Sequence, residues 1–255
     1  MSDFVYTETE VKDMCNEALK KRPSLFYKEN FVKNTGHIKN TGVSYTEFIA
    51  QFLIDNIADY KNGIKQITRE KSSYYTRSHD GEYKVNPAGE ENKKYDRKEE
   101  KIAMDMYKAC QHGGEFDVIG KIIDYQTPLK NIRDDKAGKI DLLAYDGKKL
   151  RILELKRPDN DDTMLHCILE AYTYFQTVDK VKLIKDFNDG CHLDMPENEG
   201  IVRASALVFE NSRQYSDYNE YSALRELINT LGVEVLAMRE ENGEYKISIL
   251  HEVKE

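Results

Sequence analysis

Apolar residues in the first sixty positions recur with the period of a helix. The pattern predicts one helix over residues 8–20 and a second helix that begins after Ser44. Ser44 and Glu47 form the sequence signature of a capping box, and Val43 and Phe48 form that of a hydrophobic staple. The second helix then has one apolar face, made of Phe48, Ile49, Phe52, Leu53 and Ile57. The N-terminal part of the chain is therefore expected to be helical.

From residue 98 onward the pattern alternates between the two periods. A helix is predicted over residues 98–110, and Gly113 and Gly114 end it because glycine adopts the left-handed C-terminal position at little cost. Strands are predicted over residues 116–125, 138–145, 149–156, 201–209, 233–239 and 244–250, and further helices over residues 161–178 and 221–231. This order predicts an α/β fold with a mixed sheet flanked by helices.

Residues 61–98 separate these two parts and are rich in Lys, Arg and Tyr. We expect them to form mostly loop. Basic residues interleaved with Tyr74, Tyr75 and Tyr83 suit an arm that contacts nucleic acid through phosphates and base stacking, although an ordinary solvated loop has the same composition. The predicted division is a helical and loop extension over residues 1–94 and a main domain over residues 95–255.

The composition is that of a globular protein, with 40% hydrophobic and 33% charged residues. No apolar run approaches the roughly 18 residues of a membrane helix, and the N-terminus lacks the pattern of a secretory signal, so we expect a cytoplasmic protein. A net charge of −8 argues against a protein that coats nucleic acid, but not against an enzyme with a local basic groove. The cysteines form no C-x-x-C pair, so neither a zinc site nor a disulfide framework is expected.

Three charged side chains stand among the leucines of the predicted hairpin over residues 138–156. The Asp-Gly pair at 146–147 predicts a two-residue turn, which places Asp141 opposite Ile152. Asp141, Glu154 and Lys156 then share one face, and the β-carbons of the two acids are about 7 Å apart as diagonal neighbours. A bulged turn that shifts the register by one residue would move Asp141 to the other face.

Two carboxylates and an ammonium group on one face suit a hard divalent cation with a cationic neighbour. A buried carboxylate without a partner is strongly disfavoured, so these charges need an explanation. A purely structural ion pair between Glu154 and Lys156 in an unrelated α/β protein is the alternative, and it leaves Asp141 unexplained. The hairpin is therefore the candidate site.

Asp141, twelve further residues and then Glu154-Leu155-Lys156 resemble the motif of the PD-(D/E)XK nuclease superfamily, the restriction-endonuclease-like enzymes. The predicted αβββαβ order over about residues 95–210 is similar to the core of that superfamily, whereas Ile140 stands where the motif has proline. The resemblance implies a restriction-endonuclease-like mixed sheet and a metal-dependent endonuclease or exonuclease. The expected substrate is a nucleic acid, with DNA favoured, and many such enzymes act as homodimers.

The resemblance also implies roles for individual residues. Asp141 and Glu154 would bind Mg²⁺ or Mn²⁺ together with the carbonyl group of Leu155. Lys156 would orient or help to deprotonate the attacking water and stabilise charge on the phosphate.

The superfamily places a glutamate on the helix before the sheet, for which Glu99 and Glu100 are the candidates. Glu99 is favoured because it shares the inward face of its helix with Ile102, Ala103, Met106 and Cys110. Either acid could instead interact only with the helix dipole. Glu170 and Arg157 are accessory candidates.

A different class of function stays open at this point. The chain could be a catalytically inactive nuclease-like domain that binds nucleic acid or serves as a scaffold. The complete set of two acids and a lysine argues against this alternative. No glycine-rich phosphate loop of the Walker type is present, so no ATPase activity is expected.

Overall fold

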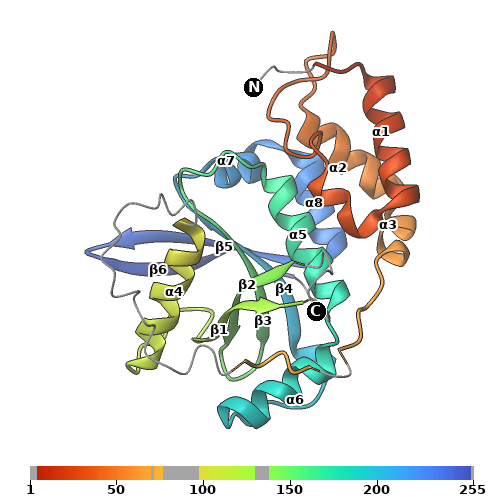
Figure 1. Cartoon of the computed structure of the whole chain (residues 1–255). Coiled ribbons are helices and arrows are strands. Elements are labelled where there is room, and N and C mark those ends of the chain that lie inside the picture. Colours follow the sequence, from red (N-terminus) through yellow and green to blue (C-terminus); the bar gives the residue numbers. More distant parts are fainter. Residues whose placement is uncertain (1–4, 70–71, 77–97, 130–137, 254–255) are drawn as a thin grey trace, which may run out of the picture.

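A mixed six-stranded sheet forms the centre of the molecule in a computed structural model that describes residues 5–69, 72–76, 98–129 and 138–253 (Figure 1). In spatial order the strands are β1 (Lys121–Pro128), β2 (Lys139–Tyr145), β3 (Leu150–Lys156), β4 (Val202–Phe209), β5 (Val233–Glu241) and β6 (Glu244–His251). The pairs β1–β2, β2–β3 and β5–β6 are antiparallel, and β3–β4 and β4–β5 are parallel. The predicted α/β class with a mixed sheet is confirmed.

Helices pack on both faces of this sheet. Those before it are α1 (Glu8–Lys21), the short 3₁₀ helix η1 (Pro23–Lys28), α2 (Tyr45–Asp55), α3 (Ile57–Gly63) and α4 (Lys98–Gln111). Those after β3 are α5 (Met164–Thr177), α6 (Lys180–Cys191), η3 (Glu199–Ile201), α7 (Arg213–Glu220) and α8 (Ser222–Leu231). Among the described residues, no helix is long and apolar enough to cross a membrane.

Alternate side chains of β3 enter two separate hydrophobic clusters. Leu150 and Ile152 pack in the cluster that contains α5 and α8, whereas Leu153 and Leu155 pack in the cluster that contains α4. This alternation is the normal consequence of the pleat of a strand. Because both faces are covered, every residue of β3 is buried, and any charged residue in it must find its partners inside the protein (Figure 1).

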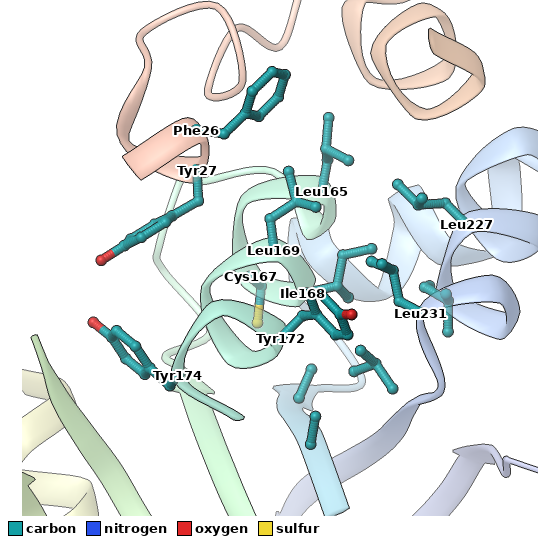
Figure 2. Close-up of a cluster of buried hydrophobic side chains, with 14 of the residues drawn as sticks. Phe26, Tyr27, Leu165, Cys167, Ile168, Leu169, Tyr172, Tyr174, Leu227 and Leu231 are labelled. Atoms are coloured by element: carbon teal, nitrogen blue, oxygen red, sulfur yellow. The ribbon is translucent and has the colours of Figure 1, made fainter. Parts of the chain in front are cut away.

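The N-terminal helices share their core with the sheet domain. One continuous cluster contains Phe26 of η1, Leu53 of α2, Leu169 of α5 and Leu227 of α8. Figure 2 shows side chains of η1 and α8 gathered around α5. The described residues of the N-terminal region, which the sequence suggested to be an extension, therefore contribute to the main core.

Local signals in the sequence explain how α5 and the last hairpin begin and end. The Thr163 side chain accepts a hydrogen bond from the backbone N–H of His166 and caps α5. Gly232 ends α8 at φ = 70°, and Asn242 and Gly243 form the β5–β6 turn with φ values of 54° and 81°. These features confirm the predicted boundaries closely.

The capping box predicted for α2 is only half formed. Ser44 accepts a hydrogen bond from the Glu47 N–H, as expected. The Glu47 carboxylate, however, accepts hydrogen bonds from the Ser222 hydroxyl and the Ala223 N–H at the start of α8. The two helices pack side by side, so this acid caps its neighbour and ties the N-terminal helices to the sheet domain.

The predicted register of the β2–β3 hairpin is wrong by two residues. Tyr145 pairs with Leu150, because the Asp146 side chain accepts hydrogen bonds from the N–H groups of Lys148 and Lys149 and closes a longer loop. Continuing the observed ladder places Asp141 opposite Glu154 instead of Ile152. A shift of two residues preserves the face of every side chain, so the expected grouping of the charges survives.

The segment that follows α3 lies against α5 and α6. Tyr74 is fully buried, its hydroxyl group accepts a hydrogen bond from the Asp179 N–H, and Arg69 lies over its ring. Tyr75 packs against Phe187. In this arrangement Tyr74 has no exposed ring face for base stacking, contrary to the arm hypothesis. Tyr83, the third aromatic residue of that hypothesis, lies outside the described residues.

Candidate functional site

Three polar side chains form a row across β1, β2 and β3. The Gln126 Nε2 donates to Asp141 Oδ1 at 3.0 Å, and the Leu155 N–H donates to Asp141 Oδ2 at the same distance. In β2 the paired residues of the β2–β3 ladder begin at Leu142, which pairs with Leu153, so Asp141 is the residue next to the end of the ladder. The carboxylate of Asp141 therefore accepts the hydrogen bond of the Leu155 N–H in place of a backbone carbonyl group of β2. Asp141 lies beside Glu154 in this arrangement.

Lys156 connects this row to α5. Its Nζ lies 2.6 Å from Glu154 Oε1 and 3.1 Å from Glu170 Oε2. Glu170 Oε1 accepts a hydrogen bond from the Tyr174 hydroxyl at 2.7 Å. Glu154 and Lys156 are each 4% exposed, so these interactions take place almost without solvent. The structure thus brings together the predicted Asp141, Glu154 and Lys156 with the accessory candidate Glu170.

Burial makes ionisation of the two opposed acids unfavourable. It raises the pKa of Asp141 to about 6, with Lys156 opposing the shift and Glu170 adding to it. Burial and the negative charges of Asp141 and Glu170 also raise the pKa of Glu154 well above its usual value, although Lys156 opposes this. Three carboxyl groups around one ammonium group leave an excess of acid, and a further cation would offset it.

Lys156 remains protonated in this environment. Burial lowers its pKa, but Glu154 and Glu170 outweigh burial and raise the pKa well above the ordinary value. Burial likewise disfavours the ionised form of Glu170, yet Lys156 and the hydrogen bond from the Tyr174 hydroxyl lower the pKa of Glu170 to about 2. An ammonium group has no lone pair, so Lys156 can orient and stabilise anions but is poorly suited to accept the proton of a water molecule.

Glu99 lies beside the site and holds a loop. Its Oε1 accepts hydrogen bonds from the Asn160 Nδ2 at 2.6 Å and from the Arg157 N–H at 3.3 Å, both in the loop between β3 and α5. The Arg157 side chain pairs with Asp159 at 3.3 Å. Glu100, the next residue of α4, is half-buried. Of the two glutamate candidates, Glu99 is the one placed at the loop that follows the motif.

Sequence reasoning gave no role to Gln126 and treated His166 and Tyr174 as packing or surface residues. Gln126 is a polar residue near the end of a predicted strand, which is a weak signal. On α5, however, a regular spacing was available: Asp162, His166, Glu170 and Tyr174 follow one another at intervals of four residues. Such positions share one side of a helix, so Glu170 could have been used to find its neighbours.

The residues present fit a small hard cation. Glu154 Oε2 is buried and has no hydrogen-bond partner among the described residues, so one oxygen atom in the cluster lacks an interaction that burial requires. No group of three or more His, Cys, Asp or Glu side chains in the described part of the chain is arranged as a metal site. Mg²⁺ needs fewer, because it binds one or two carboxylates and keeps several water molecules. Asp141, Glu154 and the Leu155 carbonyl are the fitting donors.

Comparisons of the chain with known protein families, with curated protein sequences and with solved structures found no match. The geometry and electrostatics of the site itself are therefore the basis for inferring its function.

Proposed function

We propose that the chain is a metal-dependent nuclease with a restriction-endonuclease-like fold, and that it hydrolyses phosphodiester bonds in DNA. The observation that carries the proposal is the buried, unpartnered Glu154 Oε2 beside Asp141 and the Lys156 ammonium group. The order α4-β1-β2-β3-α5, followed after the additional helices α6 and η3 by β4, agrees with the αβββαβ order expected of such enzymes. Asp141 and Glu154 together carry more negative charge than Lys156 alone neutralises, and a divalent cation would supply the missing positive charge.

In the proposed reaction Asp141, Glu154 and the Leu155 carbonyl would hold Mg²⁺ or Mn²⁺. When bound, the metal ion supplies Lewis-acid polarisation of the phosphate and a water molecule of lowered pKa. Gln126 and the Leu155 N–H fix the orientation of the Asp141 carboxylate through their two hydrogen bonds. This fixed orientation reduces the rearrangement needed at the moment of reaction.

Lys156 would act on the substrate as a cation. Its ammonium group is shared by Glu154 and Glu170, so it keeps a partner in Glu170 when Glu154 turns toward the metal ion. It can then donate hydrogen bonds to the nucleophilic water or to a phosphate oxygen, where negative charge develops. Glu170, held by Tyr174, limits how far the ammonium group can move.

Cleavage assays on single-stranded, duplex and branched DNA and on RNA test the proposal. The wild-type protein should cut only with Mg²⁺ or Mn²⁺, and Asp141→Ala or Lys156→Ala should lower the rate by about 100-fold or more. Lys21→Ala is the control, because this exposed lysine pairs with Glu17 on α1, a helix that packs against η1, α2 and α3. If circular dichroism shows folded wild-type protein and none of these substrates is cut with either metal ion, the proposal is wrong.

The second candidate is a nuclease-like domain that binds nucleic acid or a partner without catalysis. It is favoured by one observation: Lys156 already contacts both Glu154 and Glu170, which neutralises part of the acidic charge without any metal ion. A thermal titration separates the two candidates. Binding of Mg²⁺ at 100 times its dissociation constant stabilises a competent site by about 2.7 kcal/mol, and this rise should disappear in Asp141→Ala. An unchanged unfolding temperature favours the second candidate.

A further inference from the structure

Gln126 has a backbone conformation that is unusual inside a strand. Its φ is 55°, in the left-handed region, although it lies within β1 between Tyr125 and Thr127, which both pair with β2. A residue with a side chain is strained in this region because its β-carbon approaches a backbone carbonyl oxygen, and glycine avoids the strain. Such strain persists only where the surrounding structure enforces it, and it is concentrated at functional sites.

The neighbouring residues hold Gln126 in this conformation. The Thr127 hydroxyl donates to the Asp124 carboxylate, although side chains three residues apart point to opposite faces of a regular strand. The contact therefore shows that β1 is turned locally around Gln126. At the end of the strand, the buried guanidinium group of Arg69 donates to the Pro128 carbonyl group and fixes it against the segment that follows α3.

The strained residue is the one that reaches Asp141. The paired residues on either side of Gln126 place it opposite Asp141 in the β1–β2 ladder, and its Nε2 lies 3.0 Å from Asp141 Oδ1. The Leu155 N–H of β3 donates to Asp141 Oδ2 at 3.0 Å. Donors from the strands on both sides thus hold the two oxygen atoms, and the carboxylate cannot turn without losing one of these hydrogen bonds.

A fixed carboxylate matters more for some cations than for others. Mg²⁺ is small and requires nearly ideal octahedral geometry, whereas Ca²⁺ accepts a larger and more variable set of oxygen ligands. Loss of a hydrogen bond that orients a ligand typically weakens metal binding by about 10-fold to 100-fold. A carboxylate that is free to turn should therefore lose much of its affinity for Mg²⁺ and little of its affinity for Ca²⁺.

We propose that Gln126 is a positioning residue that favours Mg²⁺ over Ca²⁺ at the candidate metal site. The inference rests on the proposed function, because it takes Asp141 as a ligand of the metal ion. It goes further in assigning the choice of metal ion to a residue that orients the ligand and is not itself one. It also gives a reason for the strained glutamine in β1, at a position where glycine would avoid the strain.

The first measurement is metal binding, and it does not need activity. The unfolding midpoint of the full-length protein is followed during titration with MgCl₂ or CaCl₂ alone, which gives an apparent dissociation constant for each ion. In Gln126→Ala the constant for Mg²⁺ should rise by about tenfold or more, and the constant for Ca²⁺ by about threefold or less. Gln51→Ala is the matched control, because Gln51 also donates its amide to an aspartate, Asp55, but on the exposed side of α2. It should change neither constant.

The second measurement tests the strain and needs neither metal nor activity. Gln126→Gly and Gln126→Ala both lack the amide group, and they differ in how easily residue 126 adopts a positive φ. In EDTA the unfolding midpoint of Gln126→Gly should lie about 3 °C above that of Gln126→Ala. Equal midpoints would show that the backbone at this position is unstrained, which overturns the inference. If Gln126→Ala does not fold, Gln126→Gly replaces it in the titrations.

The outcomes separate this inference from the proposed function. A wild-type protein that binds Mg²⁺, with constants that change equally for both ions or not at all in Gln126→Ala, overturns the inference alone. A wild-type protein that binds Mg²⁺ with the expected dependence on Gln126 but cuts no nucleic acid contradicts the nuclease proposal and supports the inference. A folded wild-type protein that binds neither ion contradicts both.

Discussion

Asp141 occupies a position where a negative charge is unfavourable in the absence of metal. Burial raises the pKa of its carboxyl group to about 6, and the negative charge of Glu170 adds to this shift while Lys156 opposes it. Its two hydrogen bonds, however, could be kept by an amide. Asparagine would accept from the Leu155 N–H with its oxygen and donate to the oxygen of a Gln126 side chain that had turned over.

We therefore predict that Asp141→Asn stabilises the metal-free protein while it abolishes cleavage. A group whose pKa is raised on folding costs stability at every pH above its unfolded value, and the substitution removes this cost at neutral pH. The midpoint of thermal unfolding at pH 7.5 in EDTA should rise by about 3 °C. A midpoint below that of the wild type would show that the buried charge at position 141 is well compensated without metal.

Glu234 is the matched contrast on the same sheet. It is 3% exposed, and its carboxylate binds Arg151 at 2.8 Å and Lys149 at 3.2 Å. Glu234→Gln leaves the buried guanidinium group of Arg151 with Asp146 as its remaining acidic partner. Removal of one partner of a buried pair costs on the order of 3 kcal/mol, so the unfolding midpoint should fall in the same scan. A rise in both variants would contradict this distinction between a functional and a structural acid.

Asp162 predicts a dependence of stability on acidic pH. Burial raises the pKa of this acid, but His166 and Lys33 outweigh burial and lower it below its usual range. A lowered folded-state pKa adds stability that is fully present above the unfolded value of about 3.9 and is lost as the pH falls below it. Urea unfolding between pH 7 and pH 3 should show a smaller loss of stability in Asp162→Asn than in the wild type. Equal losses would mean that the acid gains nothing from its partners.

At the scale of elements, the loop between β3 and α5 is fixed from several sides. Glu99 of α4 accepts its hydrogen bonds from this loop, and the Gln214 side chain of α7 donates to the backbone carbonyl groups of Asn160 and Asp162. The loop joins the motif strand to the helix that carries Glu170. The position of this loop therefore determines the distance between the Lys156 ammonium group and the Glu170 carboxylate.

Substitution of Glu99 distinguishes a clamp from a metal ligand. A glutamine at position 99 can accept the same two hydrogen bonds with its amide oxygen but binds a hard cation weakly. If Glu99 only clamps the loop, Glu99→Gln should keep the cleavage rate within about threefold, whereas Glu99→Ala should lower it by about tenfold or more. A 100-fold loss in Glu99→Gln at low Mg²⁺, restored at high Mg²⁺, would instead assign Glu99 to the metal ion.

The elements that the sequence predicted well are those with both a periodic pattern and a boundary residue. The strands around Asn242-Gly243 and helix α5 after Thr163 are examples. Helices α6 and α7 were missed. The eight residues of α7 include few apolar ones, whereas α6 has 12 residues and begins at a capping residue, Asp179, which was a signal in the sequence. Strand β1 was placed too early, because Gly120 at φ = 69° packs against the backbone of Tyr145, and Phe116 closes a turn on it.

The part of the site that depends on patterns within one strand or one hairpin was predicted from the sequence. The face shared by Asp141, Glu154 and Lys156 follows from the period of a strand, and it survived an error in turn length. The hydrogen bond from Gln126 depends on which strand lies at the edge of the sheet, and the pairing of Lys156 with Glu170 depends on the fit of α5 onto β3. Neither is encoded in the spacing of a single element.

At the scale of the whole molecule, the shared core predicts that the N-terminal helices and the sheet unfold together. Phe26 of η1 packs against Tyr60 of α3, which stacks on Tyr172 of α5 with centroids 5.9 Å apart. Phe26→Ala removes a fully buried ring and should destabilise the protein by about 3–5 kcal/mol. Far-ultraviolet and near-ultraviolet circular dichroism should still give one coincident transition. A separate early transition in the variant would show that the N-terminal helices form an independent unit.

The common core also has a consequence for synthesis on the ribosome. Helices α1 to α3 are made first, but the surfaces that cover their apolar sides belong to α5 and α8, more than a hundred residues later in the chain. The ring contact between Tyr27 and His166, for example, forms only after His166 has been synthesised. The acidic residues of the site can come together only after α5 has been translated. A chain whose translation stops earlier exposes the apolar sides of α1 to α3, which chaperones bind.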